Sequence, residues 1–336
     1  MKDLGCGCGY EALAVAAGVL LVLVLLKRYF NGGWFHVPKG LSLSGKRAVI
    51  TGGNSGIGAE TARQLCELGC EVVIGGRDRK SAEKVLKDIR SKVPGAKIDY
   101  VPLDLASKES IEEFAKSVQF EAVDYLVNNA GVMALPERRV TKQGFEMQWG
   151  VNHLGHFYLT YLLWPKVSAA SNFRVINLSS LAHKKLAGFG ETPVPNFEDI
   201  NSETKYDRNH AYSRSKLFNV LFTRALAQKI GSRGIVASLH PGVVRTNLTR
   251  DMFSGSIVNK ITGIVFVLIQ PIFMFFTKNA TQGSQTTRHT LLSNDIESGC
   301  YYADCAKNSE NKHVTEENWN RLWQISEERW KVQWKP

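Results

Sequence analysis

Two side chains four residues apart, Tyr212 and Lys216, are the residues of this sequence best suited to chemistry. On a helix this spacing puts them side by side on one face. A free phenol titrates near about pH 10, and a positive charge beside it favours the phenolate and brings its proton exchange closer to neutral pH. The pair can therefore serve in acid–base catalysis. Tyr and Lys also meet at this spacing on many solvated helices, so the motifs upstream must decide between the two interpretations.

A glycine-rich turn follows the first expected strand, where residues 51–58 read TGGNSGIG and lead into a helical stretch. Glycine lets backbone N–H groups come close to a pyrophosphate, and the N-terminus of the helix adds partial positive charge. The spacing is G-x-x-x-G-x-G rather than the usual G-x-G-x-x-G. We expect a phosphate-binding turn for a dinucleotide, with a plain flexible turn as the alternative. The cofactor contacts predicted in it are Gly52, Asn54, Ser55, Gly56, Ile57 and Gly58.

The residue after the second expected strand bears on the choice of cofactor. Sites that bind a bare ribose usually have Asp or Glu there, to bond the 2′-hydroxyl. This sequence has Gly76 and Arg77 instead. Arginine would pair with a 2′-phosphate, so the sequence favours NADP(H) over NAD(H), with Asn54 or Arg47 as helpers. An ordinary surface arginine is the alternative.

From Lys46 onward, short β-branched runs alternate with helical stretches. The predicted strands are 47–51, 71–75, 97–103, 124–128, 174–178 and 235–240, with a last short strand near 299–302. The helical stretches lie near 57–69, 80–92, 107–118, 144–165 and 210–230. This alternation predicts the α/β class, in the form of a Rossmann-type doubly wound parallel sheet of about seven strands with helices on both faces.

Seven ordered motifs between about residue 44 and residue 305 resemble those of the short-chain dehydrogenase/reductase family. They are the glycine turn, Asp104, Asn128-Asn129-Ala130-Gly131, Asn152, Ser179-Ser180, the Tyr212 and Lys216 pair, and His240-Pro241-Gly242. Three further stretches, 177–183, 184–210 and 299–305, resemble the retinol dehydrogenase branch. The resemblance implies reversible hydride transfer between nicotinamide C4 and a carbonyl carbon.

The resemblance also implies a catalytic role for each matching residue. Tyr212 would give and take the proton, and Lys216 would hold the nicotinamide ribose and lower the pKa of the tyrosine. Ser180 would hydrogen-bond the substrate oxygen, with Ser179 left open as the alternative. Asn152 would anchor a water-linked proton path behind Lys216.

Further cofactor contacts follow from the same resemblance. Asp104 would bond the adenine, Asn129 and its neighbours would line the adenine-ribose side, and Thr246 would bond the carboxamide. The full set outside the glycine turn is Arg77, Asp104, Leu105, Asn129, Ala130, Gly131, Tyr212, Lys216, Pro241, Gly242 and Thr246. No metal is expected, because His153, His156, His183 and His240 lack the spacing and acidic company of zinc ligands, and we interpret them as structural or pocket-lining.

An unbroken apolar run at 12–26 is followed at once by Lys27, Arg28, Tyr29 and Phe30. At 1.5 Å per residue the run falls short of the ~30 Å hydrocarbon layer, so a buried helix, a cleaved signal peptide and a membrane anchor all come into question. No small-residue cleavage pattern follows, and the basic and aromatic residues resemble an interfacial stop. We therefore expect an uncleaved anchor in the endoplasmic reticulum or another organelle membrane, with the domain facing the cytosol.

The predicted organisation is an anchor at 1–30, a linker at 31–44, an NADP-binding domain at 45–307 and a helical tail at 308–336. A substrate-covering part lies at about 246–280. Its apolar stretch 261–276 could be a lid over an oily substrate, a bilayer contact or a buried helix pair. The Trp319, Trp323 and Trp330 stripe in the tail is expected to pack on the domain, with a membrane interface as the alternative.

The formal charge of +11 fits an anionic cofactor or a membrane surface. Basic residues are scattered without a long run, so no nucleic-acid partner is expected. The six cysteines form no ligand pairs or dense framework, which suits a reducing compartment.

The anchor and the apolar stretch together predict a lipophilic small-molecule substrate, namely a retinoid, a steroid or a fatty aldehyde. The resemblance alone ranks retinal-type aldehydes first. A homodimer is left open, and a non-catalytic NADP-binding scaffold or redox sensor is the alternative function.

Overall fold

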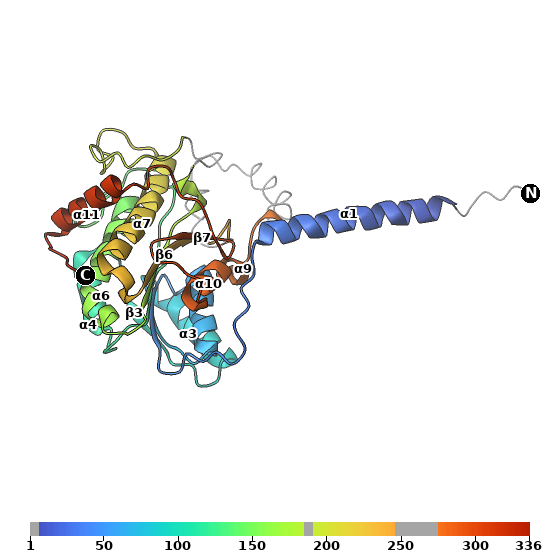
Figure 1. Cartoon of the computed structure of the whole chain (residues 1–336), viewed down its shortest axis with the longest axis horizontal. Coiled ribbons are helices and arrows are strands. Elements are labelled where there is room, and N and C mark those ends of the chain that lie inside the picture. The colour runs from blue at the N-terminus through green and yellow to red at the C-terminus, as the bar shows by residue number, and fades with distance from the viewer. Residues whose placement is uncertain (1–6, 185–190, 246–274) are drawn as a thin grey trace, which may run out of the picture.

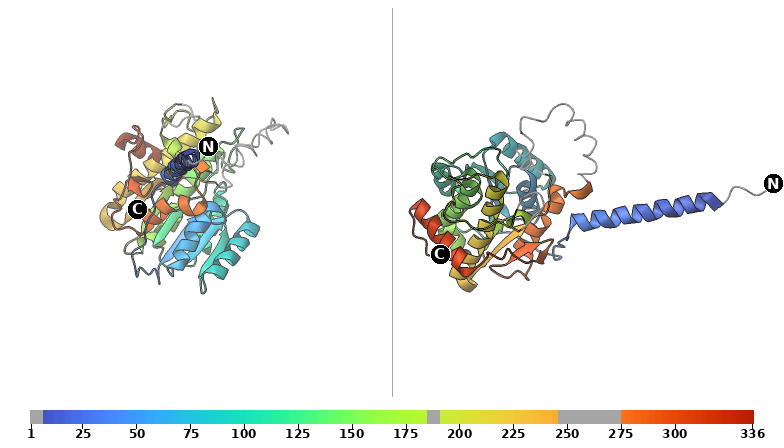
Figure 2. Two further views of the ribbon diagram at one scale, coloured as in Figure 1. Left: turned by 90° about the vertical axis from the view of Figure 1, so that its right-hand side faces the viewer. Right: turned by 90° about the horizontal axis from the view of Figure 1, so that it is seen from above.

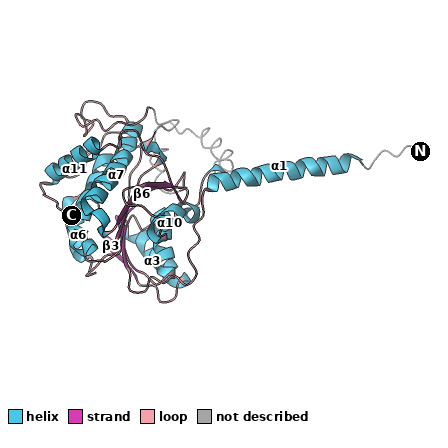
Figure 3. Cartoon of the chain, viewed as in Figure 1, coloured by secondary structure: helices cyan, strands magenta, loops and turns pink. Residues whose placement is uncertain are grey.

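One sheet runs through the body of the molecule, and helices cover both of its faces (Figure 1, Figure 3). The computed structural model describes residues 7–184, 191–245 and 275–336. The strands are β1 Arg47–Thr51, β2 Glu71–Gly76, β3 Ile98–Pro102, β4 Tyr125–Asn128, β5 Arg174–Leu178, β6 Ile235–His240, β7 Tyr301–Ala303 and β8 Ala306–Lys307. They lie in the order β3-β2-β1-β4-β5-β6-β7-β8, and only β7 and β8 pair antiparallel. Because the strand order reverses between β1 and β4, the carboxyl ends of these two strands border a crevice of the kind that binds ligands in open α/β sheets.

The central strands bury apolar side chains on both faces, because helices lie on both sides of the sheet. Val49 belongs to one buried cluster, whereas its neighbours Ala48 and Ile50 belong to the other. The helices on the Val49 side are α4 Lys108–Ser117, α6 Gly155–Ser168, α7 Arg208–Ile230 and α11 Glu316–Trp330. The opposite side carries α2 Gly56–Glu67, α3 Arg79–Lys92, α9 Ala280–Gly283 and α10 Gln285–Leu292. Asp207 caps α7 by accepting hydrogen bonds from the N–H groups of Asn209 and His210, so the helix that carries the tyrosine begins at a defined residue.

The predicted elements lie where the sequence pattern placed them, and the fold class is confirmed. β1, β5 and β6 have the predicted bounds, and the sheet gains an eighth strand because the two residues of β8 pair with the edge of β7. The predicted helix at 144–165 is built of three pieces: α5 Met147–Trp149, the π-helix η1 Gly150–Leu154 and α6. A π-helix turn inserts one residue into a helix and often marks a functional site. Here it contains Asn152.

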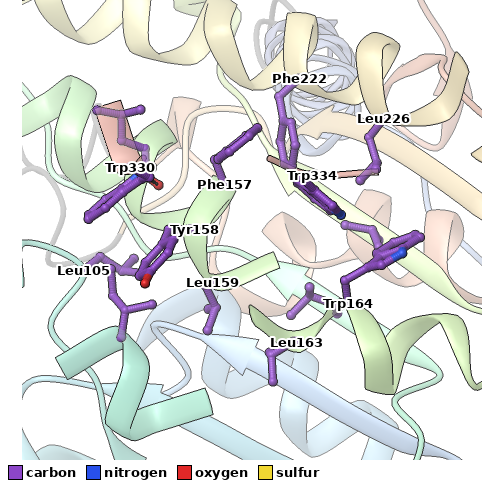
Figure 4. Packing of buried hydrophobic residues seen from close by; sticks show 14 of the residues in the cluster. Leu105, Phe157, Tyr158, Leu159, Leu163, Trp164, Phe222, Leu226, Trp330 and Trp334 are labelled. Carbon is purple, nitrogen blue, oxygen red and sulfur yellow. Dashed lines mark hydrogen bonds between the residues drawn. The ribbon is translucent and has the colours of Figure 1, made fainter. Parts of the chain in front are cut away.

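The C-terminal tail completes the larger of the two clusters (Figure 4). Trp323 and Trp330 of α11 and Trp334 beyond it are each 4% exposed. Trp330 stacks on Tyr158 of α6, with ring centroids 4.4 Å apart, and its indole N–H donates to the Leu154 carbonyl oxygen. The tryptophan stripe therefore packs on the domain, as predicted.

The first helix, α1 Gly7–Asn31, extends away from the body, and its C-terminal end contacts the described part of the domain (Figure 1, Figure 2). Leu13, Leu20 and Leu21 along it are each more than half exposed. In the described part of the chain it is the one helix, over Leu13–Asn31, with the length and apolar composition to cross a membrane.

Candidate functional site

The glycine turn is fastened to the loop after β4 by hydrogen bonds at the reversal point of the sheet. The Thr51 hydroxyl oxygen accepts hydrogen bonds from the N–H groups of Asn129 and Ala130, each at 2.9 Å. The Asn129 side-chain amide in turn donates to the carbonyl oxygens of Thr51 and Gly52, at 2.7 and 3.3 Å. The two predicted cofactor-binding segments therefore form one unit. Gly131, the last residue of the second segment, lies against Asn152 and Lys216.

Three positions of the turn require glycine, namely Gly52, Gly56 and Gly58. Gly52 and Gly56 have φ values of +67° and +54°, in the left-handed region. A Cβ at Gly58 would come within 2.5 Å of the Gly52 carbonyl oxygen. Within the described chain, the Ser55 side chain makes no capping hydrogen bond to α2. The N–H groups of the first turn are therefore available to a phosphate, and a dinucleotide fits this turn.

The Asn54 side chain lies against Gly76 at the end of β2, where a ribose phosphate is expected. A Cβ at Gly76 would lie 2.6 Å from the Asn54 side-chain oxygen, and Arg77 follows in an exposed position. The expectation that Arg47 helps them is wrong. Arg47 begins β1, with its guanidinium 5.9 Å from the Phe120 ring centre, so about 13 Å of strand separates it from the glycine turn.

Asp104 and Leu105 follow β3 and differ in what they can offer a cofactor. One carboxylate oxygen of Asp104 accepts the Ala106 N–H at 3.0 Å, and the residue stays partly exposed. The Leu105 side chain is buried in the cluster of Figure 4. Only the main chain of Leu105 can therefore face a nucleotide.

Tyr212 and Lys216 lie on α7 as their spacing predicts, with the Lys216 Nζ 5.8 Å from the centre of the Tyr212 ring. The Ser180 side chain hydrogen-bonds the Tyr212 phenol. The Ser179 hydroxyl instead donates to the main-chain oxygen of Lys216 at 2.7 Å. This geometry favours Ser180 for the role, because Ser180 is beside the phenol and the Ser179 hydroxyl is held by the α7 backbone.

Asn152 lies behind this group and is bonded on every side. Its side-chain oxygen accepts the Val132 N–H at 2.8 Å, and its amide donates to the Val132 carbonyl and the Ser215 hydroxyl, each at 2.9 Å. Lys216 Nζ donates to the Leu178 carbonyl oxygen at 3.2 Å. Asn152 on the π-helix therefore hydrogen-bonds both to the loop after β4 and to α7.

Burial dominates the electrostatics of the pair. It raises the pKa of Tyr212 to about 12, an effect that the hydrogen bond from Ser180 partly offsets. It lowers the pKa of Lys216 to about 8. The expected lowering of the tyrosine pKa by the lysine is therefore outweighed in the cofactor-free chain, where Tyr212 is a protonated phenol at neutral pH.

His156 joins the two halves of the site, a connection that its sequence position does not reveal. Its Nδ1 is 3.0 Å from the Asn152 main-chain oxygen, and its Nε2 is 2.8 Å from the Thr51 hydroxyl. Since the Asn152 carbonyl can only accept, Nδ1 carries the hydrogen and Nε2 accepts from Thr51. Burial lowers the pKa of His156 to about 4, which keeps the ring neutral and this arrangement intact.

The loop after β6 has a neighbour that sequence analysis missed. Gly242 has a φ of +86°, and a Cβ there would meet the Lys278 side chain at 2.8 Å. Lys278 is buried and pairs with Asp304 at 2.6 Å. Pro241 lies half-buried at the same place, whereas Thr246 and most of the predicted substrate-covering part, 246–274, lie outside the described residues. No motif marks Lys278, because its partners are distant in the chain.

Known proteins share this arrangement. A family model described as short chain dehydrogenase matches residues 46–191. Retinol dehydrogenase 12 of Mus musculus is 38% identical over 319 residues, which cover 92% of this chain and 93% of that protein. Retinol dehydrogenase 13 of Homo sapiens is 40% identical over 299 residues, which cover 87% and 85%. A crystal structure of an uncharacterized protein from Mycobacterium Paratuberculosis superimposes with a TM-score of 0.69 at 30% identity, over 90% of this chain and 99% of that one. Matches over most of the chain, with the shared motifs gathered at one edge of the sheet, show that this protein belongs to the retinol dehydrogenase-like branch of the short-chain dehydrogenase/reductase family, as an oxidoreductase that uses a nicotinamide cofactor.

Proposed function

We propose that this protein is a membrane-anchored oxidoreductase that transfers a hydride between NADP(H) and a lipophilic carbonyl or alcohol, with retinal and retinol first among the substrates. The observation that carries the proposal is the meeting of Ser180, Tyr212 and Lys216 at the same edge of the sheet as a glycine turn with no space for a side chain at Gly58. The names of the relatives, retinol dehydrogenases 12 and 13, support the choice of substrate class. The exposed apolar α1 supports attachment to a membrane.

The residues divide the work of carbonyl reduction. Ser180 donates a hydrogen bond to the substrate oxygen and orients it toward Tyr212, which gives its phenolic proton to that oxygen. The bound cofactor supplies the hydride to the carbonyl carbon from its nicotinamide C4. Lys216 holds the nicotinamide ribose, and its charge stabilises the phenolate that remains. Asn152 keeps the loop after β4 and α7 in place and anchors the water path by which Tyr212 regains its proton.

The remaining assignments follow from the same geometry. The pyrophosphate would lie on the N-terminus of α2, over Ser55 to Gly58. Asp104 and Asn129 would hold the adenosine side, and Pro241 and Gly242 the nicotinamide side. We retain the predicted division into anchor, linker, NADP-binding domain and tail as part of this proposal.

A substrate screen in detergent tests the proposal. The purified full chain is offered retinal, a steroid ketone and a long-chain aldehyde, each with NADPH and with NADH, and the loss of absorbance of the reduced cofactor is followed. We expect turnover with NADPH and retinal or another lipophilic aldehyde. Measurable NADPH binding without turnover of any carbonyl would support the scaffold function instead.

Cofactor choice is expected to depend on Arg77. In Arg77→Asp the carboxylate would repel the 2′-phosphate and bond a bare 2′-hydroxyl, so the KM for NADPH should rise about 100-fold while that for NADH falls. The matched control is Arg79→Asp, because the Arg79 guanidinium lies over the Tyr100 ring, 5.5 Å from its centre. Steady-state kinetics with both cofactors measure the effect. An unchanged NADPH KM in Arg77→Asp would assign this arginine to the plain surface.

A further inference from the structure

The C-terminal end of α1 is docked on the segment that leads into α9. The Lys27 ammonium donates to the carbonyl oxygens of Phe275 and Thr277, at 2.7 and 3.1 Å. One turn on, the Phe30 ring packs edge-on against Phe276, with centroids 4.8 Å apart. A cation on two carbonyl oxygens is a stronger bond than a neutral pair, so this end of α1 has a defined seat on the domain.

The chain that follows α1 lies directly on the ion pair of Lys278 and Asp304, of which Lys278 is buried and Asp304 is half exposed. A Cβ at Gly32 would come within 2.0 Å of the Asp304 carboxylate, and one at Gly33 within 2.0 Å of the Asp304 carbonyl oxygen. Asp304 pairs with Lys278, whose side chain is 5% exposed. Only glycine allows this approach. The predicted linker is therefore in tight contact with the domain at its first residues.

The contacts continue from Lys278 to the loop after β6. The Lys278 N–H donates to the Val243 carbonyl oxygen at 2.8 Å, and the Arg245 N–H donates to the Lys278 carbonyl oxygen at 3.0 Å. The Lys278 side chain fills the space beside Gly242. An unbroken series of contacts thus leads from α1 to the loop that, in the proposed function, holds the nicotinamide end of the cofactor.

We propose that α1 is a rigid part of the catalytic domain rather than a loose tether, and that Lys27 is a positioning residue that fixes the loop after β6 through Lys278. The inference rests on the proposed function only where it concerns the cofactor, since the docking stands on the contacts themselves. It predicts that the docking of α1 on the domain affects the affinity for NADPH.

The test uses the full chain in phosphatidylcholine nanodiscs with two matched pairs of variants. Lys27→Met keeps the length of the side chain and removes the ammonium, and Arg28→Met, at the exposed next position, removes one charge at the same depth. Gly33→Ala places a methyl group against the Asp304 carbonyl, and Gly18→Ala places one where nothing lies within 4 Å. The readouts are hydrogen exchange at the Lys278 amide and the NADPH dissociation constant from fluorescence titration.

We expect Lys27→Met and Gly33→Ala to speed exchange at Lys278 and to raise the NADPH Kd about tenfold, with kcat at saturating cofactor changed less than about twofold. Arg28→Met and Gly18→Ala should match the wild type in both readouts. Equal exchange in all four variants would overturn the docking. Faster exchange with an unchanged Kd would overturn the transmission to the loop. If the wild type binds no NADPH, both the proposed function and the effect of α1 on the loop after β6 are wrong. Hydrogen exchange at the Lys278 amide would still test the docking of α1.

Discussion

Replacement of Tyr212 by phenylalanine should lower kcat about 10⁴-fold, the upper end of what a general acid contributes. Tyr212 is 4% exposed and its phenol is hydrogen-bonded to Ser180. Burial raises the pKa of the phenol to about 12, so it is protonated at neutral pH. In the proposed mechanism the Tyr212 hydroxyl gives the proton to the substrate oxygen. Removal of this one oxygen atom leaves the ring and its packing in place. Single-turnover oxidation of bound NADPH in the presence of retinal measures the loss.

The matched control is Tyr161→Phe, because Tyr161 packs against Tyr158 and Trp334 on the far side of α6. Its kcat should stay within about twofold of the wild type. Tyr161→Phe should also keep the wild-type NADPH affinity, and both variants should stay folded at the assay temperature. Retention of more than a tenth of the activity in Tyr212→Phe would show that another group delivers the proton.

Replacement of Lys216 by methionine should separate activity from stability. We expect kcat to fall about 10³-fold, because the variant has no charge to hold the cofactor ribose and stabilise the phenolate. The protein itself should become more stable at pH 7. Lys216 is 3% exposed, and burial lowers its pKa from 10.5 to about 8, so its charge is a cost to the folded state.

Because burial lowers the pKa of Lys216, the stability of the wild type depends on pH in a defined direction. Below pH 8 the folded chain carries the buried charge, and the full cost, about 3 kcal/mol at most, is present. Between pH 8 and 10.5 the unfolded chain binds more protons at this site than the folded chain, so the stability of the wild type rises with pH. The stability advantage of Lys216→Met should therefore shrink across this window. Denaturant unfolding at pH 7, 9 and 10.5 measures it.

Lys229→Met is the control for this pair of effects. Lys229 lies on the same helix, near its end, with an exposed side chain over the Trp323 ring. Activity should be unchanged, and no gain in stability at pH 7 is expected, because the exposed ammonium stays in contact with water in the folded chain. A Lys216→Met protein that is less stable than the wild type at pH 7 would mean that the ammonium is a net stabilising group in the fold.

The sequence predicted those elements whose limits depend on neighbouring residues, and it missed those that depend on distant ones. The β-branched runs at β1, β5 and β6 are each bounded by residues that favour loops, so their limits could be predicted to the residue. The π-helix at Gly150–Leu154 could not, since all five of its residues are buried and no apolar stripe marks the position of the inserted residue. The two-residue β8 forms only because the edge of β7 is there to pair with it.

The sequence by itself determined the order of the strands and helices, the glycine turn and the placing of Tyr212 beside Lys216, because each depends on residues within a few positions of one another. The tertiary structure decided that Ser180 rather than Ser179 meets the phenol and that Lys278 supports Gly242. These contacts join segments that are brought together only when both faces of the sheet are packed. Spacing along the chain carries no information about which atoms then meet.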